Sequence, residues 1–119
     1  MSSHRMKTYS GESGYVYQYY FLESQPRKKW WNRIGTAFRF HVTSDRKEFV
    51  VIEVLVEESA LQAWERAHGR PLDSTEQYAA AKMRLFRAFD ESEKPEKIAE
   101  VRVSDANIEA LLEPLHLAD

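Results

Sequence analysis

Apolar and polar residues alternate most regularly along residues 36–57, in the runs TAFRFHVTS and EFVVIEVLVE. Period-two alternation and a high content of β-branched and aromatic residues predict two strands, and the three residues between the runs predict a tight hairpin loop. Such a loop places Phe40 opposite Ile52 on an apolar face and Arg39 opposite Glu53 on a polar face. We therefore expect a hairpin in this register, with an ion pair between Arg39 and Glu53.

A third strand is predicted from YVYQYYFLE, residues 15–23, which is rich in aromatic side chains. Alternation puts Tyr17 and Tyr19 on one face and Val16 and Tyr20 on the other, so that both faces are largely apolar. The second face is then either covered or left as an exposed apolar patch, and an exposed patch is typical of proteins that self-associate. We expect a homodimer on this ground.

Apolar residues three and four positions apart predict three helices. Ser59 and Gln62 have the spacing of a capping box at the start of the first helix, and Gly69 suits its C-terminal end. Asp73 and Ser74 each have a suitable capping partner three residues later, so the second helix begins at one of them. The predicted helices span about 59–68, 74–90 and 105–113.

Together these elements predict a single α+β domain over residues 1–119, with the helices packed mainly on one face of an antiparallel sheet. The polar residues 1–13 are expected to form a loose N-terminal arm. The sheet has three strands and a candidate fourth, so it is three- to four-stranded. The predicted strands span about 14–24, 35–44 and 48–57, and the candidate fourth spans 98–103.

The composition excludes several kinds of chemistry. No residue is cysteine, which excludes disulfides, thiol catalysis and cysteine-bound metal clusters. The histidines are scattered, and neither a metal-site spacing nor a phosphate-binding glycine motif occurs. We therefore expect no metal and no cofactor. No apolar run approaches the ~20 residues of a membrane span and no signal peptide is evident, so we expect a cytoplasmic protein with no membrane contact.

Charge is divided unevenly along the chain. Residues 1–47 contain nine Lys or Arg and three Asp or Glu, whereas the remainder contains eight and sixteen. This division indicates either an anionic partner for the first part or attraction between the two parts within the fold. Both interpretations stay open at this point.

A basic and aromatic segment is the sharpest candidate for binding. Its tryptophans lie between cations, on a stretch expected to be a connecting loop because Pro26 ends the preceding strand. Phosphates beside the cations and bases stacked on the indoles would suit a nucleic acid, and the cations would also suit an acidic protein. Alternatively, the indoles pack back over the sheet while the cations face water. The candidate binding residues are Arg27, Lys28, Lys29, Trp30, Trp31 and Arg33.

Two weaker candidates concern catalysis. Arg39, His41 and Glu53 share the polar face of the hairpin, where the His could act as an acid or base on an anion held by the Arg. The simpler interpretation is a solvent-facing surface with an ordinary ion pair. Lys82 falls on the apolar side of the second helix, where a buried lysine could serve as a nucleophile or base. More often, the stem of such a lysine lies on the apolar surface and its ammonium reaches the edge.

Folding alone accounts for the capping residues, the patterning and the charge pairs, so no group stands out as catalytic. We therefore expect a non-catalytic binding or interaction domain that self-associates. One alternative is a nucleic-acid or polyanion-binding module that uses residues 26–33. The other is a small enzyme or ligand-binding domain with a pocket between the sheet and the helices.

Overall fold

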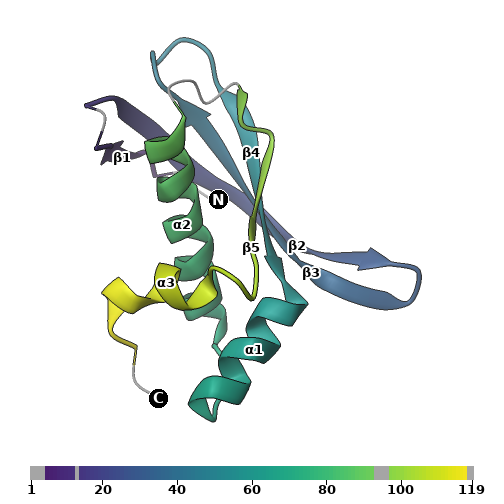
Figure 1. Ribbon diagram of the computed structural model, residues 1–119. Helices are drawn as coiled ribbons and strands as arrows, with labels where there is room; N and C mark the ends of the chain where they lie inside the picture. Colours follow the sequence, from purple (N-terminus) through teal and green to yellow (C-terminus); the bar gives the residue numbers. More distant parts are fainter. Residues whose placement is uncertain (1–4, 13, 93–96, 118–119) are drawn as a thin grey trace.

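The fold is α+β, with one curled five-stranded sheet (Figure 1). The computed structural model describes residues 5–12, 14–92 and 97–117. Strands β1 to β4 pair antiparallel in chain order, and β5 lies parallel to β4 at the edge opposite β1. The strands are β1 (Lys7–Ser10), β2 (Val16–Lys29), β3 (Asn32–Thr43), β4 (Val50–Glu57) and β5 (Glu100–Val103).

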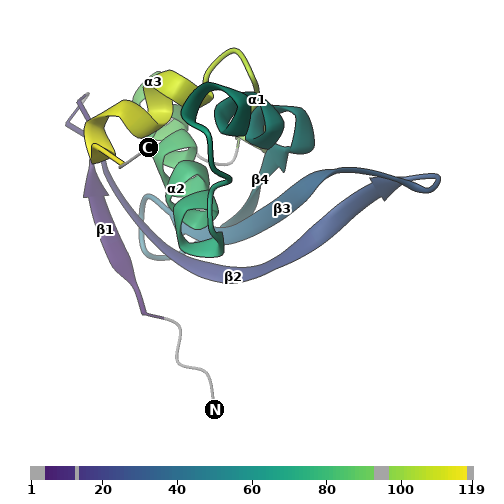
Figure 2. The ribbon, with the colours of Figure 1, turned by 90° about the horizontal axis from the view of Figure 1, so that it is seen from below.

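The helices lie on the concave side of the sheet, and β2 and β3 curve beneath α2 (Figure 2). Their apolar sides and the concave face of the sheet enclose the core, in which Tyr17 stacks on Phe89 with ring centroids 4.4 Å apart. The helices are α1 (Glu58–His68), α2 (Ser74–Glu91) and α3 (Ile108–Leu112), followed by the 3-10 helix η2 (Glu113–Leu115).

The register predicted for the central hairpin is confirmed. Phe40 pairs with Ile52 on the buried face, and Arg39 pairs with Glu53 on the open face. The connecting segment is longer than the predicted three residues, because β3 ends at Thr43 and β4 begins at Val50. A hairpin register therefore follows from side-chain burial even where the length of the loop does not.

The sheet has more strands than predicted, and it is mixed. Within the predicted loose arm, residues 7–10 form β1, which pairs with β2 and is held by the Tyr9 hydroxyl, a donor to Asp90 Oδ2 at 2.8 Å. The candidate fourth strand exists as β5, but it is parallel to β4. Parallel neighbours need a crossover connection, which α1 and α2 provide here.

Strand β2 continues through Pro26 instead of ending before it. A proline is tolerated where a strand lies at an edge, and the part of β2 near Pro26 lies beyond the short β1. Its partner strand contains Gly35, where an added Cβ would lie 2.4 Å from the carbonyl oxygen of Val56. Only glycine therefore allows β3 and β4 to pass this closely.

Of the three predicted signals at the ends of α1 and α2, two are confirmed, and α3 is shorter than the predicted 105–113. Asp73 and Glu76 form the predicted capping box of α2, and Gly69 ends α1 in the left-handed region at φ 79°. The predicted box between Ser59 and Gln62 is wrong, because β4 runs directly into α1 and Glu57 becomes the N-cap without a side-chain bond.

Candidate functional site

The candidate site is the end of a β-ribbon formed by residues 25–35 of β2 and β3, which projects from the body of the protein in both views (Figures 1 and 2). Lys29 pairs with Asn32, so the chain reverses over Trp30 and Trp31 alone. Trp30 has φ 58°, in the left-handed region that such tight turns require. What the sequence predicts as a loop is thus an ordered extension of the sheet.

The two indoles at this turn are exposed to solvent. Trp30 and Trp31 are 83% and 86% exposed, whereas Trp64 is buried in the core. Their ring centroids lie 6.3 Å apart at an interplanar angle of 59°, so neither ring is stacked flat on the other. The interpretation in which both indoles pack back over the sheet is therefore wrong.

The four cations of this segment differ in their surroundings. The side chains of Lys28 and Lys29 are exposed and make no hydrogen bond or ion pair with any described residue. Arg33 donates to Thr36 Oγ1 at 2.7 Å and lies 3.8 Å from Glu58. Arg27 is paired with Glu53 at 2.5 Å, so its charge is compensated. We define the ribbon tip as Lys28, Lys29, Trp30, Trp31 and Arg33.

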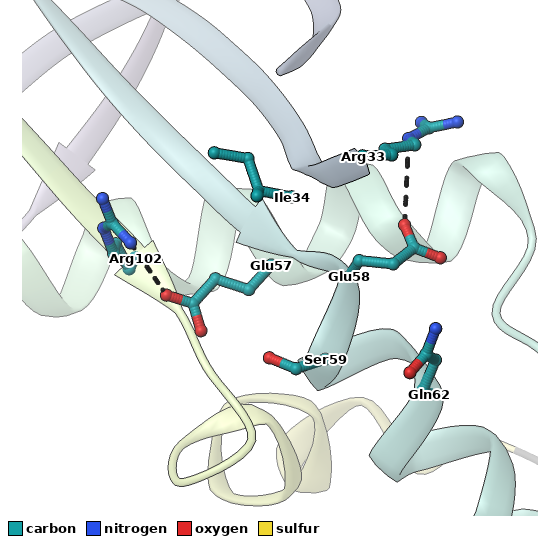
Figure 3. A pocket seen from close by; sticks show the side chains of 7 residues that line it. All are labelled: Arg33, Ile34, Glu57, Glu58, Ser59, Gln62 and Arg102. Atoms are coloured by element: carbon teal, nitrogen blue, oxygen red, sulfur yellow. Dashed lines mark hydrogen bonds and ion pairs between the residues drawn. The ribbon is translucent and has the colours of Figure 1, made fainter. Parts of the chain in front are cut away.

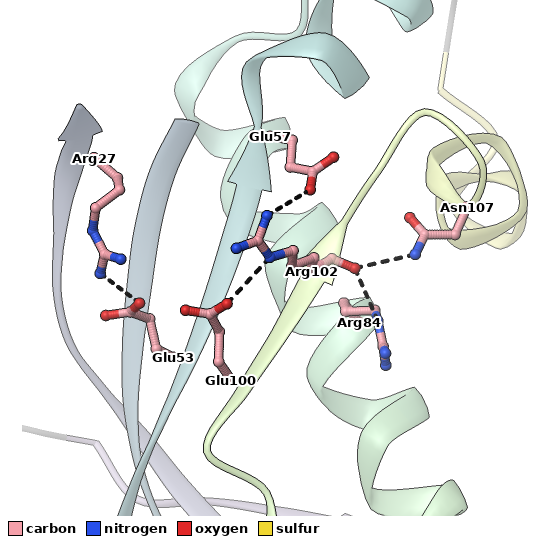
Figure 4. Close-up of polar contacts among 7 residues, drawn as sticks. All are labelled: Arg27, Glu53, Glu57, Arg84, Glu100, Arg102 and Asn107. Carbon is pink, nitrogen blue, oxygen red and sulfur yellow. Dashed lines mark hydrogen bonds and ion pairs between the residues drawn. The ribbon is translucent and has the colours of Figure 1, made fainter. Parts of the chain in front are cut away.

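Further charged residues link β5 to its neighbours (Figure 4). Arg102 donates to Glu57 from Nη1 and to Glu100 from Nε, each at 3.2 Å, and these bonds raise the pKa of Arg102 above its ordinary value. The carbonyl oxygen of Arg102 accepts from Arg84 at 3.0 Å and from Asn107 at 3.1 Å. These bonds engage Arg102 and Asn107, whereas Nη1 of Arg84 is buried without a hydrogen bond to any described residue and lies 3.7 Å from Glu91.

The candidate catalytic residues of the hairpin are engaged by separate partners. Arg39 Nη1 donates to Glu23 at 3.1 Å, which replaces the predicted ion pair with Glu53. His41 Nδ1 is hydrogen-bonded to the Tyr20 hydroxyl. Because Glu53 is bound by Arg27, the structure places these candidates on one face without joining them in one hydrogen-bonded group.

Lys82 lies on α2 close to two aromatic rings. Its Nζ lies 5.6 Å from the ring centroid of Tyr78 and 5.9 Å from that of Phe86. Desolvation by burial, followed by the charge of the neighbouring Lys7, lowers the pKa of Lys82 below its ordinary value. The ammonium of Lys82 thus lies over the faces of two aromatic rings, and the cation of Lys7 lies nearby.

A cavity of about 480 Å³ lies where β3, β4, β5 and α1 meet (Figure 3). Arg33 lies beside Glu58, and Arg102 binds Glu57, so the two cations at this cavity are each matched by a carboxylate. Ser59 and Gln62 supply neutral polar groups. The cavity offers a ligand little uncompensated charge.

A second cavity, which we call the acidic pocket, has a volume of about 570 Å³. It is formed by β1, α2, α3 and η2. Asp90 accepts hydrogen bonds there from the Tyr9 hydroxyl and from the backbone N–H of Glu12. Desolvation, and then the bond to Asp90, raises the pKa of Tyr9 to about 12. The residues that line the acidic pocket are Tyr9, Glu12, Met83, Phe86, Arg87, Asp90, Glu91, Ala110, Leu111 and Pro114.

The acidic pocket was not predicted, because its residues come from three separate stretches of sequence. Only the excess of carboxylates after residue 47 pointed towards an acidic surface. Among the described residues, no group of three or more His, Asp or Glu could hold a metal ion. No helix within the described ranges 5–12, 14–92 and 97–117 is long and apolar enough to cross a membrane.

Comparisons with protein-family models, with curated proteins and with solved structures found no match.

Proposed function

We propose that this protein is a non-catalytic interaction domain that associates with itself through the ribbon tip. The observation that carries the proposal is the near-complete exposure of Trp30 and Trp31 at the end of a projecting ribbon. Tryptophan offers a large apolar surface, and tryptophans are enriched among the residues that dominate binding at protein interfaces. Burying both indoles against a second molecule would remove this surface from water.

The construction of the ribbon supports the same proposal. Cross-strand pairing continues to Lys29 and Asn32, so the indoles are presented on an ordered support. A preorganised contact element loses less conformational entropy on binding than a flexible loop does. The tip is therefore suited to make contacts without first having to fold.

The outer face of β2, from which we expected self-association, offers less apolar surface. Val16 is 48% exposed, and Phe49 and Val51 nearby are 37% and 38% exposed. Tyr20 on the same face contacts His41 and Phe49. The apolar surface that these residues expose is smaller than that of the ribbon tip and is partly covered. The tip is therefore the better candidate for the surface that mediates self-association.

Sedimentation velocity over a range from low to high micromolar protein tests the proposal. The wild-type chain is expected to shift to larger species with concentration, and the double variant Trp30→Ala/Trp31→Ala is expected to stay monomeric. Tyr15→Ala, which truncates a 46% exposed aromatic side chain elsewhere, serves as the matched control and should associate like the wild type. A monomeric wild type, or a double variant that associates unchanged, would overturn the proposal.

A second candidate function is the binding of single-stranded nucleic acid. Lys28 and Lys29 support it, because both are exposed and unpaired among the described residues and both flank the indoles. Cations along a phosphate backbone with bases stacked on aromatic rings are the usual means of sequence-tolerant single-strand binding. Titration of an oligothymidylate tests this candidate.

A further inference from the structure

We infer that the ribbon tip of one copy docks in the acidic pocket of a second copy of this chain. The inference rests on the proposed self-association and names the surface that receives the tip. It uses two features that the proposed function leaves unexplained, the acidic pocket itself and the unequal division of charge along the sequence.

The lining of the acidic pocket suits an aromatic side chain. Met83, Phe86, Leu111 and Pro114 give it an apolar lining, and methionine adapts readily to the shape of a bound group. Its volume of about 570 Å³ lies within the ~300–1,000 Å³ that is typical of binding pockets. An indole entering from solvent would therefore meet apolar atoms in a space of suitable size.

The charges of the two surfaces are complementary. Three carboxylates, those of Glu12, Asp90 and Glu91, line the acidic pocket, and Arg87 is the one cation among its described lining residues. Glu91 also lies 3.7 Å from Arg84 Nη1, and together the two arginines leave the site with an excess of one carboxylate. Lys28 and Lys29 flank the indoles on the tip and have no carboxylate partner among the described residues. Docking would bring the lysines towards the carboxylates, which favours this orientation and speeds encounter.

The geometry requires a second copy. In both views the ribbon points away from β1 and α3, which border the acidic pocket (Figures 1 and 2). A tip therefore does not reach the acidic pocket of its own chain. Since tip and pocket are different surfaces, the contact is heterologous, and repetition of it gives a closed ring or a head-to-tail chain.

Charge reversal separates the two surfaces experimentally. The tip variant Lys28→Glu/Lys29→Glu and the pocket variant Glu12→Lys/Glu91→Lys should each weaken self-association at least about tenfold, because like charges then face each other. Asp90 is left unchanged because it holds Tyr9 of β1. Thermal melting should show that both variants fold. Arg46→Glu/Lys47→Glu, which reverses two exposed cations in the β3–β4 connection, is the matched control and should associate normally.

Mixing the two variants gives the sharpest result. In the mixture the unchanged tip of the pocket variant meets the unchanged pocket of the tip variant, and the reversed tip meets the reversed pocket. Every tip again faces a pocket of opposite charge, so an equimolar mixture should recover the self-association that each variant alone has lost. Failure of the mixture to associate would overturn the inference. Self-association that is lost in the tip variant and unchanged in the pocket variant would overturn the inference while sparing the proposed function. A wild type that stays monomeric would overturn both, and oligothymidylate binding by that monomer would assign the tip to nucleic acid.

Discussion

Arg39 stands opposite Glu53 in the β3–β4 ladder, yet its guanidinium binds Glu23 on β2 at 3.1 Å. Glu53 is bound instead by Arg27, from the root of the ribbon. These ion pairs lie on the open face of the sheet, where solvent weakens them. Phe40, the neighbour of Arg39 in sequence, points to the opposite face and is fully buried.

Truncation on the two faces of β3 should therefore have different effects. Phe40→Ala is expected to lower the free energy of unfolding by ~3–5 kcal/mol, because it removes a core ring and leaves a cavity. Arg39→Ala should cost less than ~1 kcal/mol, as expected for an exposed ion pair. Urea unfolding of both variants measures the difference. Similar losses at the two positions would contradict the assignment of the faces.

The parts of the fold that the sequence predicts are those determined by local alternation. A one-residue slip in the hairpin would move Phe40 to the open face, so burial selects a single register. Strand β1 lacks such a pattern and depends on distant contacts, since Tyr9 stacks on Phe86 with ring centroids 4.4 Å apart. The parallel pairing of β5 with β4 also depends on tertiary structure, because α1 and α2 bring the chain back to the edge of the sheet beside β4. Neither is visible in a local window of sequence.

The sequence singles out the segment that forms the candidate site, but it does not predict that this segment is a β-ribbon. The mixture of cations and indoles singled out residues 27–33, whereas Pro26 wrongly indicated the end of β2. A proline is compatible with an edge strand, and whether a strand lies at an edge depends on its neighbours in space. Exposure of Trp30 and Trp31 follows from the same tertiary arrangement, because the ribbon extends beyond the helices.

Gly35→Ala should destabilise the sheet at the root of the ribbon. The new Cβ would lie 2.4 Å from the Val56 carbonyl oxygen, a backbone atom that moves only if β3 and β4 separate. A loss of ~1–3 kcal/mol in the free energy of unfolding is expected, as for other overpacked sites. Hydrogen exchange should quicken first at the pairing of Gly35 with Glu57. Unchanged stability would show that the strands separate here at little cost.

The capping box of α2 should make stability depend on acid pH. Hydrogen bonds from Arg70 and from the backbone of Asp73 lower the pKa of Glu76 from its ordinary 4.5 to about 2. A lowered folded-state pKa stabilises the protein above the unfolded pKa, and this stabilisation is lost as pH falls from about 4.5 towards 2. Glu76→Gln should thus be less stable than the wild type at neutral pH and approach it near pH 2.

Unfolding of the wild type and of Glu76→Gln, followed across that pH range, measures this convergence. Glu65→Gln, at an exposed position on α1, is the control for replacing a surface glutamate on a helix. A stability difference that stays constant between neutral pH and pH 2 would contradict the role given to ionised Glu76.

Tyr9→Phe should loosen β1 without unfolding the rest of the chain. The substitution removes the hydroxyl that donates to Asp90 at 2.8 Å but keeps the ring that stacks on Phe86. A loss of ~1 kcal/mol is expected for one hydrogen bond, or more if Asp90 is left without a replacement partner. Hydrogen exchange should increase in β1 while the pairing of β3 with β4 keeps its protection. Equal increases in both regions would mean that β1 is not a separate local unit.

Binding of oligothymidylate is the remaining test of the ribbon tip. If Lys28 and Lys29 meet phosphates, affinity should fall steeply with salt, and Lys28→Ala/Lys29→Ala should bind more weakly with a shallower dependence on salt. The matched pair Arg46→Ala/Lys47→Ala, in the β3–β4 connection, should behave like the wild type. If the indoles stack on bases, Trp30→Ala or Trp31→Ala should lose ~1–3 kcal/mol of binding free energy. The melting temperature should stay unchanged, because both side chains are exposed. Absence of binding at low salt would exclude this function for the tip, and we expect that result if the tip serves self-association.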